Sequence, residues 1–228
     1  FGGGGYKVSG GLHGVGASVV NALSEKMWVE VVPDPEVQGA DKAGKVFRQD
    51  YAKGAPQNEL TAHKLSAPRK SGSTISFKPD SSIFESVDFD FKIEAERLRL
   101  YAFLTKKVWF RLLDQRDGRE VNYYFEGGIK SFVRHVNHDR DALNFDPIYA
   151  DREIDGNVIE FAIQYNDGYN ETVYTFANSI NTIDGGSHMT GFRQALTRVL
   201  NDWARKAKIL KDNDPNLTGD DVREGLVA

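Results

Sequence analysis

The sequence contains no cysteine among its 228 residues. This absence excludes disulfide bonds, thiol nucleophiles and cysteine-based metal sites, and it fits a reducing compartment. The sequence also lacks an apolar run that approaches the length of a membrane span, and no signal peptide is visible. We therefore expect a cytoplasmic protein that does not bind a membrane.

A strong net charge is missing as well. Lysine and arginine number 29 while aspartate and glutamate number 33, which gives a formal net charge of −4. The strongly basic surface of many nucleic-acid-binding proteins is therefore absent, so any contact with DNA must be local or made by other parts of the protein. Apolar residues make up 40% of the chain and suffice for the core of one large or two modest domains.

Glycine, in contrast, is concentrated at the start of the chain. Gly11, Gly14 and Gly16 lead directly into an apolar periodic segment that begins at Val19. A glycine loop followed by the start of a helix presents backbone N–H groups that suit an anion such as phosphate. The spacing fits neither the dinucleotide fingerprint, which needs a preceding strand, nor the Walker loop, which ends in Gly-Lys-Ser/Thr. From the spacing alone, a phosphate-binding loop and a flexible connector remain equally open.

The hydrophobic patterns predict short helices and strands in alternation, typical of an α+β protein. In the first part we expect a helix over residues 18–24, strands over 27–31, 46–51 and 73–77, a helix over 94–106, strands over 108–112 and up to 125, and a helix over 129–136. Residues 33–44 are predicted to be a polar hairpin loop. Because residues 138–147 are polar and aperiodic, we place a domain boundary near residue 140.

Beyond this boundary, residues 159–165 alternate as a strand, and a turn at Asp167-Gly168 leads to a second strand near 172–176. Apolar residues at helical spacing predict a helix over 191–209. Thr218 and Asp221 have the spacing of a capping box, which predicts the start of another helix.

Five blocks of sequence resemble the ATPase subunits of the bacterial type IIA topoisomerases, which are the DNA gyrase B family and its paralogue, the topoisomerase IV B family. Both belong to the GHKL superfamily, together with histidine kinases, MutL and the large heat-shock chaperones. The blocks occur in the family's order and cover essentially the whole chain: Tyr6 to Ser24, Gly72 to Phe77, Tyr124 to Phe132, Asp184 to Phe192 and Thr218 to Gly225. The resemblance identifies the first block as the family's ATP lid.

The resemblance also implies the architecture. Residues 1–140 are expected to form the lid and the later part of a GHKL α/β-sandwich ATPase domain. Residues 141–228 are expected to form the first part of a transducer domain with a ribosomal protein S5-like fold.

The resemblance further implies which residues bind ATP: Tyr6, Lys7, Gly11, Leu12, His13, Gly14, Val15, Gly16 and Ser73. The backbone of residues 11–16 would wrap the phosphates, and Lys7 would add positive charge. Tyr6 would contact the adenosine, and the Ser73 hydroxyl would help to hold adenine through a water and a carboxylate. Without the resemblance, a surface lysine, a packed tyrosine and an ordinary strand serine are the simpler interpretations.

No catalytic residue can be assigned to this chain. In the family, the glutamate that activates water and the asparagine that binds Mg²⁺ precede the lid, so we expect their equivalents before Phe1. The family's lysine that contacts the γ-phosphate is expected after Ala228. Hydrolysis needs a positioned water and metal-stabilised charge, so we expect the 228-residue chain alone to be inactive, although the parent protein uses ATP and Mg²⁺.

Two histidines raise the question of a metal site within the chain. His135 and His138 have helix-compatible spacing for a metal but no third ligand nearby. We therefore expect no metal site.

The predicted helix over residues 191–209 has a basic face made by Arg193, Arg198, Arg205, Lys206 and Lys208. A solvated helix surface is the simpler interpretation. The resemblance implies instead that arginines of this helix face the cavity through which a DNA segment passes.

By the same resemblance, the parent protein couples ATP binding and hydrolysis to DNA strand passage and negative supercoiling. Its partners would be DNA, the gyrase A subunit and a second copy of the ATPase region. Two alternatives stay open. One is the B subunit of topoisomerase IV, which decatenates DNA, and the other is a fragment that acts only as a nucleotide-binding or dimerisation module.

Overall fold

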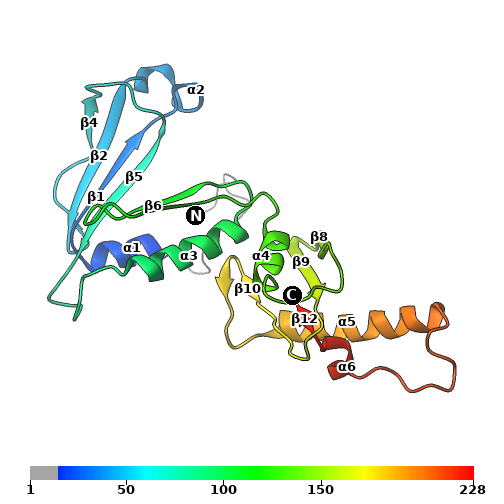
Figure 1. The fold of residues 1–228 in the computed structure, drawn as a ribbon. Coiled ribbons are helices and arrows are strands. Elements are labelled where there is room, and N and C mark those ends of the chain that lie inside the picture. The colour runs from blue at the N-terminus through cyan, green and yellow to red at the C-terminus, as the bar shows by residue number, and fades with distance from the viewer. Residues whose placement is uncertain (1–14) are drawn as a thin grey trace. The chain divides into compact units, whose positions relative to one another are not determined.

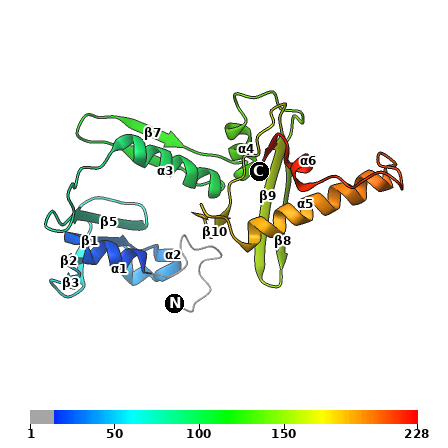
Figure 2. The same ribbon diagram turned by 90° about the horizontal axis from the view of Figure 1, so that it is seen from below.

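The computed structural model describes residues 15–228 of the chain. The contacts divide these residues into two compact units, residues 15–89 and residues 90–228, and each is described by itself. Figures 1 and 2 show the elements of both units. Each unit contains helices and antiparallel strands, which confirms the expected α+β class. The predicted domain boundary near residue 140 stays a prediction.

The first unit is built around one antiparallel sheet. Its strands run in the order β3-β2-β1-β5, with β4 also paired to β2. The bounds are α1 (Gly16–Ala22), β1 (Ser24–Val32), α2 (Pro35–Gln38), a 3₁₀ turn (Ala40–Lys42), β2 (Lys45–Ala52), β3 (Ala55–Pro56), β4 (Thr61–Lys64) and β5 (Gly72–Pro79). The predicted first helix is confirmed, although it begins and ends two residues earlier and Ser24 already belongs to β1. The three predicted strands of this part are confirmed.

The two faces of this sheet differ because side chains alternate along each strand. Val31 of β1 lies opposite Phe47 of β2 and Ser73 of β5, and Val29 lies opposite Ile75. Directly opposed residues share a face, so this face is largely apolar. The opposite face is polar and is crossed by ion pairs.

The polar face is organised by Arg48. Its guanidinium lies 3.1 Å from Glu30 and 2.7 Å from Asp50. It also lies over the ring of Trp28, 5.4 Å from the centroid. Because these charged residues alternate with apolar ones along the strands, only the opposite face of the sheet is apolar and suited to packing.

The segment between β1 and β2 differs from the predicted loop. Instead of an open loop, residues 33–44 contain α2 and the 3₁₀ turn. Asp34 accepts a hydrogen bond from the backbone of Glu36, and Pro35 occupies the first helical turn. An N-cap aspartate and an N1 proline favour a helix start, so the local sequence specifies this short turn.

The C-terminal end of α1 is fixed to the sheet. The Asn21 side chain donates to the carbonyl of Gly54, and Asp80 donates its backbone N–H to the carbonyl of Leu23. Gly54 has φ +84°, and a Cβ there would lie 3.3 Å from the Ala22 Cα. A residue with a side chain would therefore be strained at this turn.

The second unit combines a three-stranded sheet with two hairpins and four helices. The sheet has the order β12-β9-β8, and the hairpins are β6-β7 and β10-β11. The bounds are α3 (Phe91–Leu104), β6 (Phe110–Leu113), β7 (Glu120–Tyr123), α4 (Ile129–Val136), β8 (Ile148–Ile154), β9 (Asn157–Tyr165), β10 (Phe176–Ala177), β11 (Ile180–Asn181), α5 (Ser187–Lys206), α6 (Gly219–Arg223) and β12 (Leu226–Val227).

The core of this unit lies where α4 packs on β9. Val133, Ala162 and Val227 are each at most 3% exposed and form one cluster. Phe103 of α3 extends this core, since its ring centroid lies 5.4 Å from that of Phe132 of α4 and stacks on Phe125 at 3.7 Å. The predicted helix over residues 129–136 is confirmed at both ends.

Two predictions for this unit need correction. The sequence interpretation missed β8, which pairs with β9 through a turn at Asp155-Gly156, where both residues have positive φ. The predicted strand over residues 172–176 is wrong, because this segment has only a bridge at Thr172 and the strand starts at Phe176. The pairing partner, rather than the local pattern, decides which short segment becomes a strand.

The two predicted helices at the C-terminal end are confirmed with small shifts. The first is α5, and the second, α6, starts with the predicted capping box. The Thr218 hydroxyl accepts from the Asp221 N–H at 3.2 Å, and the Asp221 carboxylate accepts from the Thr218 N–H at 2.7 Å. None of the helices within residues 15–228 is long and apolar enough to cross a membrane.

Candidate functional site

Most residues predicted to bind the nucleotide precede the described part of the chain. Tyr6, Lys7, Gly11, Leu12, His13 and Gly14 lie outside the described residues, and so does Phe1, before which the catalytic glutamate is expected. Val15, Gly16 and Ser73 lie within them. The geometry available for the candidate site therefore concerns the start of α1 and one face of the first sheet, and the position of a catalytic glutamate before Phe1 stays a prediction.

Val15 and Gly16 lie where α1 begins. Val15 is the N-cap residue and supplies no side-chain hydrogen bond to the helix. An added Cβ at Gly16 would meet no atom within 4 Å. The described residues therefore leave room for a side chain at position 16. A glycine here would instead allow the backbone to approach a ligand closely.

Ser73 lies on the apolar face of the sheet. It is exposed in β5 and lies directly opposite Val31 of β1. Ile75, two residues further along the same face, is 58% exposed. The hydroxyl of Ser73 is therefore a polar group at the border of an otherwise apolar surface.

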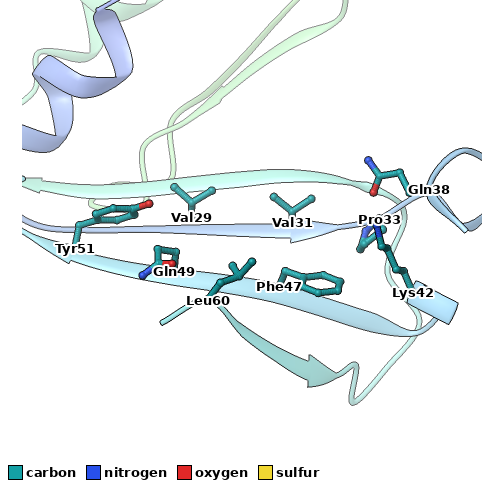
Figure 3. A pocket seen from close by; sticks show the side chains of 9 residues that line it. All are labelled: Val29, Val31, Pro33, Gln38, Lys42, Phe47, Gln49, Tyr51 and Leu60. Carbon is teal, nitrogen blue, oxygen red and sulfur yellow. The ribbon is translucent and has the colours of Figure 1, made fainter. Parts of the chain in front are cut away.

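The same face carries a pocket of about 560 Å³ between β1 and β2 (Figure 3). Its lining is formed by Val29, Val31, Pro33, Gln38, Lys42, Phe47, Gln49, Tyr51 and Leu60. A pocket of this size with an apolar floor and a few polar groups suits a flat organic ring. Ser73 is not part of the lining. It lies on β5, directly opposite the lining residue Val31 of β1, on the same face of the sheet.

This pocket was not found from the sequence. Lys42 and Gln38 reach it from the segment between β1 and β2, which was predicted to be a plain loop. Its lining contains no carboxylate. The described pocket therefore has no acidic side chain with which to activate water.

A buried carboxylate lies at the end of β5. Asp80, whose side chain is 7% exposed, forms an ion pair with Lys53 at 3.2 Å. Hydrogen bonds from the side chain and backbone of Ser82, together with the Lys53 ammonium, lower the pKa of Asp80 to about 2. Asp80 is thus charged at neutral pH, and its ion pair with Lys53 joins the end of β5 to the turn after β2.

The basic face predicted for α5 separates into two groups. Arg193 forms a two-bond ion pair with Glu171 at 2.9 Å, and Arg205 donates to the carbonyls of Lys211 and Asp214. These two arginines therefore stabilise the fold. Within residues 15–228, no ion pair or hydrogen bond is formed by the side chains of the other three: Arg198, Lys206 and Lys208.

The two histidines with metal-compatible spacing have different surroundings. His135 stacks on Phe103 with ring centroids 5.4 Å apart, and burial lowers its pKa. His138 lies 2.7 Å from Asp139. Among the described residues, no group of three His, Cys, Asp or Glu side chains could hold a metal ion.

The chain is similar to known DNA gyrase B sequences. The family model described as DNA gyrase B matches residues 128–228. The chain is 47% identical to the DNA gyrase B subunit of Clostridium acetobutylicum and 48% identical to that of Halalkalibacterium halodurans, with 100% of this chain and 34% of each relative covered. It thus spans about a third of the length of these relatives.

Solved structures show the same relationship. The 43K ATPase domain of Thermus thermophilus gyrase B, in complex with an aminocoumarin, superposes with a TM-score of 0.80 and 36% identity, covering 94% of this chain and 56% of that one. A topoisomerase IV ATP-binding domain of Francisella tularensis, in complex with a small-molecule inhibitor, shares the fold with a TM-score of 0.71 and 22% identity, covering 96% and 57%. The chain belongs to the DNA gyrase B family and matches part of its ATPase region.

Proposed function

We propose that this chain binds ATP as part of a bacterial DNA gyrase B protein and couples nucleotide binding to DNA strand passage. The observation that carries the proposal is the similarity of the whole chain to gyrase B sequences, which includes the glycine loop directly before α1. The shared α+β fold with a gyrase B ATPase domain supports it independently.

The described residues fit the adenine end of the nucleotide. The apolar face of β1, β2 and β5 offers a flat surface for a purine, and the exposed Ser73 hydroxyl offers a hydrogen-bonding group on that face. Backbone N–H groups of residues 11–16 would hold the phosphates, and Lys7 would add positive charge. ATP, when bound with Mg²⁺, would supply the phosphoanhydride bond whose hydrolysis prepares the parent protein for another round of strand passage.

We further propose that the 228-residue chain does not hydrolyse ATP by itself. Phosphoryl transfer to water needs a group that positions the water and a metal that neutralises charge. The lining of the described pocket includes no acidic side chain that could activate water. The chain's own contribution is then to bind and orient the nucleotide.

The two-domain organisation is part of this proposal. The first domain would carry the nucleotide, and the second would be a transducer domain with an S5-like fold. We place the junction near residue 140, in the polar and aperiodic segment over residues 138–147.

The partners proposed for the parent protein follow from its relatives. They are DNA, the gyrase A subunit and a second copy of the ATPase region, in the cytoplasm of a bacterium. Arg198 and Lys206 of α5, and Lys208 just after its end, are the cations best suited to contact DNA phosphates, because the described structure does not use them for internal contacts.

Calorimetric titration of the chain with a non-hydrolysable ATP analogue tests the binding proposal, and phosphate release from ATP tests the turnover proposal. We expect saturable binding that Lys7→Ala weakens, with no release of phosphate above background. The matched control is Lys206→Ala, which removes an exposed lysine remote in sequence from the loop. No binding at millimolar analogue would overturn the first proposal, and turnover abolished by Lys7→Ala would overturn the second.

A further inference from the structure

Lys106 joins the end of α3 to the sheet formed by β8 and β9. Its ammonium lies 2.5 Å from the Glu160 carboxylate of β9 and 2.5 Å from the Tyr149 hydroxyl of β8. It also lies 4.5 Å from the centroid of the Tyr149 ring. A single side chain therefore makes an ion pair, a hydrogen bond and a cation–π contact with two adjacent strands.

The acceptors around this ammonium hold one another in place. The Tyr149 hydroxyl lies 2.9 Å from the Glu160 carboxylate and 3.2 Å from the Asp151 carboxylate. Burial lowers the pKa of Lys106, but the contacts with Glu160 and Tyr149 outweigh that effect and raise the pKa. The lysine is thus charged near neutral pH, where it pairs with the Glu160 carboxylate.

A glycine makes room for the lysine stem. Gly128, the N-cap residue of α4, has φ +55°, and a Cβ there would lie 2.5 Å from both Cγ and Cε of Lys106. The stem of Lys106 therefore passes directly over a bare Cα. Three segments meet at this point: the end of α3, the start of α4 and the β8–β9 hairpin.

We propose that Lys106 is a positioning residue that fixes α3 to the β8–β9 hairpin and so sets the geometry between the nucleotide-side and DNA-side parts of the protein. This inference rests on the proposed function, because that function assigns α3 to the ATPase domain and β8–β9 to the transducer domain. A charged, three-way contact at the junction transmits a movement of α3 to the hairpin, whereas a junction without it lets the two move separately.

The absence of cysteine allows a direct test. Spin labels attached through Glu96→Cys on α3 and Glu153→Cys on β8 report the distance between the two elements, and both positions are exposed. Pulsed electron–electron double resonance on the nucleotide-free chain then gives the distribution of that distance. Lys106→Met keeps the stem but removes the charge, Lys106→Arg keeps the charge, and Lys206→Met is the control at an exposed lysine of α5.

We expect a narrow distribution in the labelled parent and in Lys106→Arg and Lys206→Met. In Lys106→Met and in Glu160→Gln we expect the width to increase at least about twofold, because the charge-assisted contacts are lost. Rescue by arginine separates a positioning role from a general need for lysine in folding. If Lys106→Met does not fold, Glu160→Gln decides the outcome.

An unchanged width in Lys106→Met, or in Glu160→Gln where only that variant folds, would overturn the proposal. The measurement contains no nucleotide, so failure of the chain to bind ATP leaves the result intact. Conversely, the chain could bind the ATP analogue while the distance distribution stays narrow both with Lys106 and in Lys106→Met. That result would reject the positioning role and leave the proposed function standing.

Discussion

Ser73 of β5 lies directly opposite Val31 of β1, on the apolar face that also carries the pocket between β1 and β2. This register brings a hydroxyl to the surface proposed to receive adenine. Ser76 of the same strand lies opposite Trp28, on the polar face. The two serines therefore form a matched pair, with similar chemistry on opposite sides of one strand.

The first prediction uses this pair. Ser73→Ala should weaken binding of a non-hydrolysable ATP analogue by roughly twofold to tenfold, because a neutral hydrogen bond contributes about 0.5–1.5 kcal/mol. Ser76→Ala should leave the affinity unchanged. Calorimetric titration of both variants measures the difference, and equal effects of the two substitutions would show that the apolar face does not bind the base.

The second prediction concerns the ion pairs of Glu171. This carboxylate lies 2.9 Å from Arg193 and 3.4 Å from Arg223. Glu171→Ala leaves the Arg193 guanidinium without its acceptor and leaves Arg223 paired only with the exposed Asp220, so we expect the free energy of unfolding to fall by about 1 kcal/mol. Asp202→Ala removes an exposed carboxylate of α5 and should have no effect. Urea unfolding followed by circular dichroism compares the two, and an equal loss in both variants would contradict a specific role for Glu171.

The third prediction is a pH dependence of stability. The pKa of Asp80 is about 2 in the folded chain, below its ordinary value of 3.8. A lowered pKa contributes stability above the unfolded value, and this contribution is lost as the pH falls from about 4 towards 2.

In Asp80→Asn, the free energy of unfolding should therefore be lower at pH 6 and should fall less steeply between pH 4 and pH 2. Asp212→Asn, at an exposed aspartate, is the control. Urea midpoints across this pH range provide the measurement. Parallel pH profiles for the parent and Asp80→Asn would refute the assigned role of the Asp80 carboxylate and its contacts with Ser82 and Lys53.

The fourth prediction concerns the core of the second unit. Leu226 is 0% exposed, while Leu143 is 71% exposed. Leu226→Ala should reduce the free energy of unfolding by about 2–5 kcal/mol, because a buried leucine loses transfer free energy and leaves a cavity. Leu143→Ala should change it little, and thermal unfolding of the two variants gives the comparison. Similar melting temperatures would mean that β12 is not part of the cooperative core.

Local signals in the sequence predicted much of the secondary structure. The apolar spacing of residues 129–136 predicted α4 at both ends, and Thr218 with Asp221 predicted the cap of α6. The segment over β8 was missed although Asp155-Gly156 is a strong hairpin signal, because the charged residues of β8 obscured its alternation. The strand expected at residues 172–176 failed because pairing partners, which a local pattern does not specify, decide strand formation.

The candidate site was less predictable than the fold. Ser73 was found through its family motif, but the pocket beside it depends on the register of β1 against β2 and on a helical turn between them. The contact of Arg193 with Glu171 joins residues 22 positions apart, and that of Lys106 with Glu160 joins residues 54 apart, by subtraction of their numbers. Such long-range pairs arise from tertiary packing and have no local signal.

Backbone nuclear magnetic resonance of the isotopically labelled chain, titrated with a non-hydrolysable ATP analogue, shows which residues respond to the nucleotide. We expect chemical-shift changes concentrated in residues 6–16 and around Ser73 and Ile75, with α5 unaffected. Shifts confined to the surface around Arg193 and Arg223, or no shifts at saturating analogue, would contradict this expectation.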